Sequence, residues 1–182
     1  MWWIVDPDQI YVVVDIETTG GRPPAHRITE IGAVKVQGGE VIDRWQSLIN
    51  PKRTIRRTIT HLMGIDDGMV ADAPTFEQIA DEFEAFVDDG VFVAHNVRFD
   101  HGFIAAEYAR LDRKFRSPQL CTCQSMRTHY KGLPSYGLAS LCSHFEIPLD
   151  KHHRAMCDSE AAAESLKLVI RKRVAAGEMK PW

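Results

Sequence analysis

Two carboxylates stand where a buried strand is expected to end. Asp15 and Glu17 follow the apolar run Ile10 to Val14, within the segment Asp15-Ile16-Glu17-Thr18-Thr19-Gly20. An Ile/Val-rich run of this kind is typical of a central strand, and side chains two apart on a strand project to the same side. Two adjacent carboxylates repel each other unless a cation or a shared proton relieves them, and Mg²⁺ and Mn²⁺ prefer oxygen ligands. The pair indicates either a divalent-cation site or a strand that simply leaves the core through a polar Thr-Thr-Gly turn.

A third acid, Asp100, lies where a short apolar stretch gives way to a predicted helix. It directly follows His95-Asn96-Val97-Arg98-Phe99. Ligand crevices in open α/β sheets lie at the carboxyl ends of strands. An acid in the first turn of a helix is also favoured by the helix dipole alone. On this segment, a site residue and an ordinary helix-terminal acid are equally good interpretations.

A fourth acid, Asp158, stands on the inward face of the last predicted helix. The residues at offsets of three, four, seven and eleven are Ala161, Ala162, Ser165 and Val169. This small, mainly apolar face should pack on the sheet, where a carboxylate is costly unless it is paired or bound to a metal. His153, five residues earlier, fits either a general base near neutral pH or a surface histidine.

Brought into one crevice, these groups would suit two-metal phosphoryl transfer. One cation would lower the pKa of a bound water, His153 would accept its proton, and the second cation would stabilise charge on the departing oxygen. Paired metals of this kind lie about 3.5–4 Å apart and need a bridging carboxylate, for which Asp15 is the natural candidate.

The elements that must position these residues read as one α/β unit. The expected strands are Tyr11 to Ile16, Arg27 to Val36, Glu40 to Ile49, Val91 to Ala94 and Gln119 to Cys123. The expected helices are one that Pro74 opens, with an apolar stripe from Phe76 to Phe86, and then Arg98 to Leu111, Tyr136 to His144 and Ala155 to Ala175. Gln37-Gly38-Gly39 is a hairpin signal, so the first three strands should pair antiparallel. This order predicts a mixed five-stranded sheet flanked by helices, in a single domain over residues 1–182 with a core of about 10–172.

The bulk composition is that of a globular protein. The 182 residues are 45% hydrophobic and 26% charged, and the apolar runs are far shorter than the ~20 residues of a membrane helix. The N-terminus lacks the basic and apolar regions of a secretory signal. The four cysteines form no disulfide framework or zinc spacing, and Cys121 and Cys123 fit a buried strand. A reducing cytoplasm is therefore expected.

The net charge of −3 does not favour a nucleic-acid partner, but the basic residues cluster. The clusters are Lys52, Arg53, Arg56 and Arg57; Arg110, Arg113, Lys114 and Arg116; and Arg171, Lys172 and Arg173. Such patches can follow a phosphate backbone, and each can equally be a solvated face. Trp2-Trp3 and Pro181-Trp182 fit a docking surface, packing residues or chain ends. A polymerase or other protein partner, the oligomeric state and a larger parent chain are left open.

Three segments, in order, resemble the exonuclease motifs of the DEDDh family. They are Asp15-Ile16-Glu17-Thr18-Thr19-Gly20, His95-Asn96-Val97-Arg98-Phe99-Asp100 and His153-Arg154-Ala155-Met156-Cys157-Asp158. The likeness runs from about Tyr11 to Ile170. It is greatest to the branch that contains the proofreading epsilon subunit of bacterial DNA polymerase III and its stand-alone relatives. The resemblance implies a ribonuclease-H-like fold and 3′→5′ removal of nucleoside 5′-monophosphates from a nucleic-acid end.

The resemblance also implies residue roles. Carried over by position, Asp15, Glu17, Asp100 and Asp158 would hold two Mg²⁺ or Mn²⁺ ions. His153 would be the base, because it has the four-residue gap to Asp158 that the motif requires, which His152 misses by one. Further residues expected near the substrate end are Thr18, Thr19, Met63, Gly64, Ile65, His95, Asn96 and Phe99. Met63 to Ile65 match a loop that wedges terminal bases in similar enzymes, and Phe99 fits stacking or a core role.

Three functions compete on this basis. The first is a metal-dependent 3′→5′ DNA exonuclease of the proofreading or repair type. The second is an RNA exonuclease like oligoribonuclease or ribonuclease T, since discrimination depends on contacts around the 2′-OH. The third is a nucleic-acid-binding scaffold that keeps the fold. Loss of an acid or of His153 would have indicated the scaffold, and none is lost.

Overall fold

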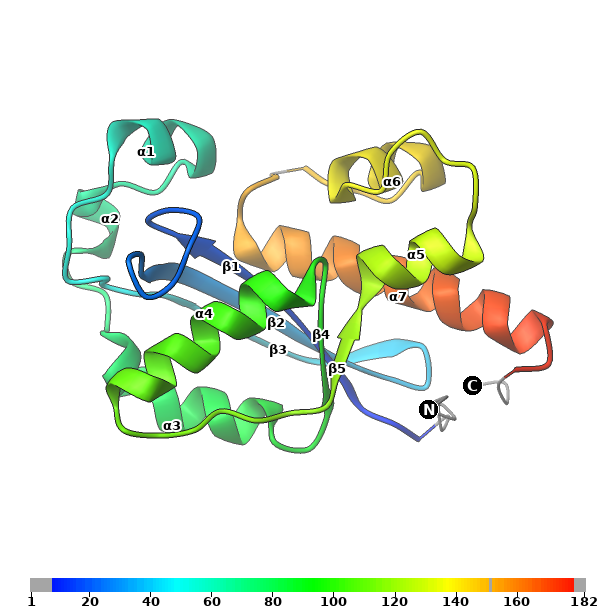
Figure 1. The fold of residues 1–182 in the computed structure, drawn as a ribbon, viewed down its shortest axis with the longest axis horizontal. Helices are drawn as coiled ribbons and strands as arrows, with labels where there is room; N and C mark the ends of the chain where they lie inside the picture. Colours follow the sequence, from blue (N-terminus) through cyan, green and yellow to red (C-terminus); the bar gives the residue numbers. More distant parts are fainter. Residues whose placement is uncertain (1–7, 151, 179–182) are drawn as a thin grey trace.

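A five-stranded mixed sheet with helices on both faces forms the protein (Figure 1). The computed structural model describes residues 8–150 and 152–178, so the predictions about Trp2-Trp3 and Pro181-Trp182 lie outside the described residues. The strands are β1 (Tyr11–Thr18), β2 (Ile28–Gln37), β3 (Glu40–Leu48), β4 (Val91–Ala94) and β5 (Gln119–Cys121). The helices are α1 (Arg57–Met63), α2 (Asp67–Val70), α3 (Phe76–Val87), α4 (Val97–Arg110), α5 (Thr122–His129), α6 (Leu138–Phe145) and α7 (Ala155–Ala175).

The sheet has the order β3-β2-β1-β4-β5. β2 pairs antiparallel with both β1 and β3, whereas β4 is parallel to β1 and to β5. The predicted mixed sheet with an antiparallel first half is therefore confirmed. Within the described ranges, no helix combines the length and the apolar character that crossing a bilayer would need.

The period of two along β1 divides its side chains between two layers. Val12, Val14 and Ile16 join the core beneath α3 and α4. Tyr11 and Val13 face the opposite layer, where α6 and α7 pack. Figure 1 shows these two helical layers on either side of the sheet. By the same alternation, the next two odd positions of β1, which are the acids, point toward α7.

The first turn of α7 lies directly on β2 because Gly32 has no side chain. A Cβ atom on Gly32 would lie 2.4 Å from the carbonyl carbon of Ala155 and from the amide nitrogen of Met156. Real Cβ atoms essentially never come closer than 3.0 Å to another heavy atom. Gly32 is also the cross-strand partner of Asp15. The missing side chain thus brings the start of α7 close to the first catalytic candidate.

Several predicted boundaries were wrong. β1 continues to Thr18, two residues past the expected end at Ile16, so Glu17 lies inside the strand together with Asp15. Pro74 does not open α3, since Thr75 caps it through a reciprocal pair of hydrogen bonds with Gln78. Cys123 lies in a helix and not in a strand, because β5 ends at Cys121. Helices α1, α2 and α5 were not predicted, since each is short and its apolar spacing is too sparse to show a period.

Candidate active site

A pocket of about 500 Å³ opens at the carboxyl end of β1. Its lining residues come from β1 and the loop after it, from the turn after β4, from α1, α4 and α6, and from the first turn of α7 with the segment before it. They are Asp15, Ile16, Glu17, Thr18, Gly20, Gly21, Ile59, Leu62, Met63, His95, Phe99, Leu138, His152, His153 and Asp158. In Figure 1, α1 stands on one side of this end of β1 and the start of α7 on the other.

Three of the four predicted acids converge in the pocket. Asp15, Glu17 and Asp158 each offer a carboxylate oxygen, and the three atoms lie within 4.8 Å of one another. Asp100, in the first turn of α4, is only 3% exposed and does not line the pocket. Its charge nevertheless acts on Asp15, for which it is the strongest repelling neighbour. The sheet and two helices therefore bring together four acids that are up to 143 positions apart in the sequence.

The site holds these acids in an electrostatically unfavourable arrangement. Burial, followed by repulsion from Asp100 and Asp158, raises the pKa of Asp15 well above its usual range. Burial and the charge of Asp158 raise the pKa of Glu17 to about 8. Burial likewise raises the pKa of Asp100, against hydrogen bonds from the backbone. A hard divalent cation would relieve this cost, and a set made only of carboxylate oxygens fits Mg²⁺ or Mn²⁺.

Two neighbouring histidines, His152 and His153, stand over Asp158. The ring of His152 lies with Nδ1 2.9 Å and 3.0 Å from the two carboxylate oxygens of Asp158. His153 donates its backbone N–H to the same carboxylate at 3.1 Å. Burial and the neighbouring His152 lower the pKa of His153, and Asp158 partly opposes this. The contact of His152 was not predicted, and its position beside the motif histidine was the signal that could have indicated it.

An ion pair between a buried carboxylate and a partly exposed arginine fixes the start of α7. Glu30 is 4% exposed on β2, opposite Glu17. Its carboxylate accepts hydrogen bonds from the guanidinium of Arg154 at 2.7 Å and from the backbone N–H of Ala155 at 3.0 Å. Arg154 occupies the N-cap position, but its side chain accepts no hydrogen bond from the backbone of the first turn. The carboxylate of Glu30 accepts a backbone N–H of that turn in its place. Asp158 follows one turn later. In the sequence, the position of Glu30 inside a mainly apolar predicted strand was the signal that could have indicated its charged partner.

Four of the predicted substrate residues line the pocket: Thr18, Met63, His95 and Phe99. The ring of His95 is anchored, because its nitrogens lie 3.0 Å from the hydroxyl of Thr122 and 2.9 Å from the carbonyl oxygen of Tyr136. His95, which directly follows β4, therefore connects the edge of the pocket to the start of α5 and to the segment before α6.

The other four predicted substrate residues do not line the pocket. Thr19 is buried, and its hydroxyl accepts the backbone N–H of Arg27 at 3.1 Å. Ile65 is fully buried in a small core of its own, Gly64 ends α1 in a left-handed conformation, and Asn96 makes the left-handed turn before α4. In their place α1 presents Ile59 and Leu62 to the pocket. Leu62 is 56% exposed.

The basic clusters differ in their surroundings. Arg56 and Arg57 begin α1 beside the pocket and are exposed, and the described residues give neither an ion pair. Arg113 instead pairs with Asp81 at 2.5 Å and with Glu84. The first cluster is therefore the one whose charge is available next to the candidate site.

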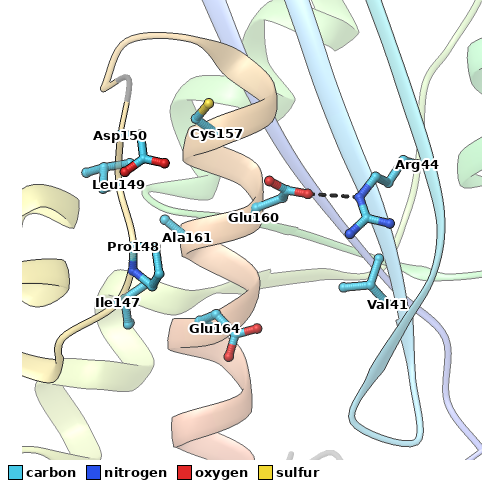
Figure 2. Close-up of a pocket in the computed structure, with 10 residues that line it drawn as sticks. All are labelled: Val41, Arg44, Ile147, Pro148, Leu149, Asp150, Cys157, Glu160, Ala161 and Glu164. Atoms are coloured by element: carbon cyan, nitrogen blue, oxygen red, sulfur yellow. Dashed lines mark hydrogen bonds and ion pairs between the residues drawn. The ribbon is translucent and has the colours of Figure 1, made fainter.

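A second hollow, of about 410 Å³, lies on the outer side of α7 (Figure 2). Figure 2 shows Arg44 reaching from β3 to Glu160 on α7, and the two groups pair at 2.8 Å. Ile147, Pro148 and Leu149 provide apolar walls. This hollow shares no lining residue with the pocket at β1, so the converging acids belong to the β1 pocket alone.

Comparison with known proteins identifies similar sequences. Residues 12–166 match the family model described as Exonuclease (RNase T). The chain is 38% identical over 172 residues to the PolC-type DNA polymerase III of Bacillus subtilis (strain 168), which covers 93% of this chain and 12% of that protein. It is 40% identical over 161 residues to the PolC-type DNA polymerase III of Staphylococcus aureus, covering 88% and 11%. The chain thus spans about one eighth of the length of the curated relatives it matches.

Solved structures share the fold. Exonuclease X in complex with 5′ overhanging duplex DNA matches with a TM-score of 0.75 and 24% identity, covering 88% of this chain and 91% of that one. Escherichia coli exonuclease I in complex with a dT13 oligonucleotide matches with a TM-score of 0.83 and 19% identity, covering 93% and 43%. The expected ribonuclease-H-like exonuclease fold is thereby confirmed.

Proposed function

This chain belongs to the exonuclease family, and on that premise we propose that it releases nucleoside 5′-monophosphates stepwise from the 3′ end of DNA. The observation that carries the proposal is the set of three carboxylates within 4.8 Å of one another at the floor of an open pocket, with Asp100 buried behind them. DNA is favoured over RNA because the similar relatives are DNA polymerases and the similar structures hold DNA. A polymerase is for the same reason the proposed partner.

Two divalent cations, Mg²⁺ or Mn²⁺, would be held by Asp15, Glu17, Asp100 and Asp158. When bound, such cations supply activation of a water molecule and stabilisation of charge on the departing oxygen. The protein residues keep the four acids in place at a cost in repulsion, so that oxygen ligands are ready before the cations arrive.

His153 is the proposed base. Its lowered pKa keeps the imidazole neutral near pH 7, and it lines the pocket beside Asp158. Neutral imidazole can accept a proton, whereas imidazolium cannot. His152 and the backbone of His153 hold the carboxylate of Asp158, so Asp158 and the proposed base stay in a fixed position relative to each other.

The pocket walls suit the end of a nucleic-acid strand. Leu62 and Ile59 of α1 and Phe99 of α4 provide apolar surface on which a terminal base can rest. Stacking of a base on an aromatic ring such as that of Phe99 contributes roughly 1–3 kcal/mol without regard to sequence. Gly20 and Gly21 line the same pocket and carry no side chain, so a sugar or phosphate can approach the backbone.

The proposal is tested by digestion of 3′- and 5′-labelled single-stranded DNA, duplex DNA and RNA with Mg²⁺ or Mn²⁺. We expect mononucleotides to be released from the 3′ end of DNA and EDTA to abolish the reaction. Products only from 5′ ends or from internal cuts would refute it. A clear preference for RNA would replace the DNA substrate with the oligoribonuclease-like alternative.

Two variants separate the proposed roles. Asp15→Ala should abolish hydrolysis and weaken Mn²⁺ binding, measured by calorimetry, because it removes a ligand. His153→Ala should slow hydrolysis by about 10²–10⁴-fold while Mn²⁺ binding stays largely intact. Full activity of His153→Ala across pH would rule out its role as the base.

A further inference from the structure

The histidine pair and Asp158 form a second ligand set, chemically different from the carboxylate set. His152, His153 and Asp158 each offer one ligand atom, and these atoms lie within 4.8 Å of one another. We infer that this set binds a borderline transition-metal ion such as Zn²⁺ or Co²⁺, and that its occupation switches off hydrolysis. Metal binding at this site does not depend on the function proposed above, whereas the inhibition rests on that function.

The spacing between His152 and Asp158 is close to that of two ligands of a tetrahedral ion. Zinc lies about 2.0–2.2 Å from nitrogen and oxygen ligands, so two ligand atoms of a tetrahedral site lie about 3.3 Å apart. Nδ1 of His152 is 2.9 Å and 3.0 Å from the two oxygens of Asp158. Placing a metal ion between them therefore requires the ring and the carboxylate to separate by only a few tenths of an ångström.

The backbone places both rings on the same side. Side chains of successive residues normally diverge, but His153 has φ = 67°, in the left-handed region. The rings of His152 and His153 consequently stack with their centroids 3.9 Å apart and their planes at 24°. The hydrogen bond from the backbone of His153 to Asp158 holds this turn against α7. The two imidazoles and the carboxylate are thus neighbours, and one ring must turn out of the stack for both nitrogen lone pairs to meet at one ion.

The two ligand sets select different metals. Asp15 and Glu17 offer only oxygen, which suits Mg²⁺ and Mn²⁺, whereas imidazole favours Zn²⁺, Co²⁺, Ni²⁺ and Cu²⁺. Two histidines and one carboxylate also match the three-ligand zinc sites that leave a fourth position for water. The side chain of His152 is 38% exposed, so an ion can enter from solvent.

Occupation of this site would remove the proposed base. A metal-bound imidazole nitrogen has its lone pair engaged and cannot accept a proton. The same ion would also take an oxygen of Asp158, which the proposed Mg²⁺ or Mn²⁺ ions need. Low concentrations of Zn²⁺ should therefore inhibit hydrolysis even in a large excess of Mg²⁺.

Cobalt binding tests the site without reference to activity. The full chain should bind Co²⁺ with the visible absorption of a four-coordinate ion, and Zn²⁺, but not excess Mg²⁺, should displace it. His152→Ala and His152→Gln should each weaken Co²⁺ binding by about tenfold or more. His152→Gln retains a polar contact for Asp158 and so controls for misfolding. His144→Ala, an exposed histidine on α6, is the matched control and should bind as the parent does. Unchanged binding in both His152 variants, or displacement by Mg²⁺, would overturn the site.

Zinc inhibition is then measured in excess Mg²⁺, with each variant normalised to its own zinc-free rate. The Zn²⁺ concentration that halves the rate should rise by about tenfold or more in His152→Gln and stay unchanged in His144→Ala. Zinc bound by the histidines with no loss of hydrolysis would overturn the inhibitory role. Histidine-dependent cobalt binding in a chain that degrades no DNA or RNA would refute the proposed function and support the metal site.

Discussion

Replacement of Gly32 by alanine tests whether close packing of α7 on β2 positions the active site. The added Cβ would lie 2.4 Å from backbone atoms of Ala155 and Met156, whereas ordinary contact begins at 3.4 Å. The obstructing atoms are backbone, so no side chain can rotate away. The first turn of α7 must therefore retreat by about 1 Å from β2 to restore ordinary contact.

This retreat has a calculable cost. Overpacking of a tight interface destabilises a protein by about 1–3 kcal/mol. In a domain of this length each kcal/mol lowers Tm by about 2–4 °C, so a decrease of about 2–12 °C is expected. The retreat also stretches the 3.0 Å bond from Ala155 to Glu30 and moves Asp158 away from Asp15. A misplacement of 1 Å can reduce activity by about 10²-fold, and Mn²⁺ affinity should fall as well.

The assay compares thermal unfolding with and without Mn²⁺, Mn²⁺ affinity by calorimetry, and the rate of DNA digestion. Gly102→Ala in α4 is the matched control, because no atom lies within 4 Å of its added Cβ. Alanine in a helix is more stable than glycine by roughly 0.5–1 kcal/mol, so this control should raise Tm slightly. If Gly32→Ala kept the parent Tm and Mn²⁺ affinity, close approach of α7 to β2 would not be what places Asp158.

Three further predictions concern the charge, the positioning and the walls of the site. The pKa of Glu17 is raised from 4.5 to about 8, so the metal-free folded state binds the proton more tightly than the unfolded chain does. The contribution of Glu17 to the free energy of unfolding of the metal-free protein therefore falls by up to about 1.4 kcal/mol per pH unit as pH rises from 4.5 to 8. The increase in Tm on adding Mn²⁺ should grow over that range, and a constant increase would contradict this. Glu30→Gln should destabilise the protein by about 1–3 kcal/mol and lower Mn²⁺ affinity, because Arg154 loses its counter-charge at the start of α7; unchanged affinity would limit Glu30 to a structural role. Leu62→Ala should leave Tm nearly unchanged and raise KM for DNA, since the side chain is 56% exposed on the pocket wall; a KM equal to that of the parent would remove Leu62 from the binding surface.

Local sequence patterns predicted the elements in which the hydrophobic period continues over many residues or alternates strictly. The alternation along β1 correctly placed Asp15 and Glu17 on one side, and the small-residue face of α7 correctly placed Asp158 inward. The hairpin signal at Gly38 gave the antiparallel pairing of β2 and β3. These succeeded because each depends on neighbours within a few positions, where backbone geometry fixes which side chains share a face.

The same patterns could not resolve short elements. At the end of α1, Met63 to Ile65 were expected at the substrate; Met63 lines the pocket, but Ile65 is buried and Leu62 is exposed to the pocket instead. The rotation of a helix of 7 residues is set by the core it packs on, here Ile55 and Val70, and not by its own period. Tertiary contacts therefore decide which of several adjacent apolar residues reaches the substrate.

The sequence by itself determined the chemical inventory of this protein: four acids, a motif histidine and the strands and helices that carry them. Only the tertiary structure decided how the inventory is arranged. It placed Asp100 behind the pocket, brought His152 onto Asp158, and used Glu30 and Gly32 to hold the start of α7 against β2. The physical reason is that residue type and spacing fix what a group can bind. Contacts between residues more than a hundred positions apart fix which groups meet.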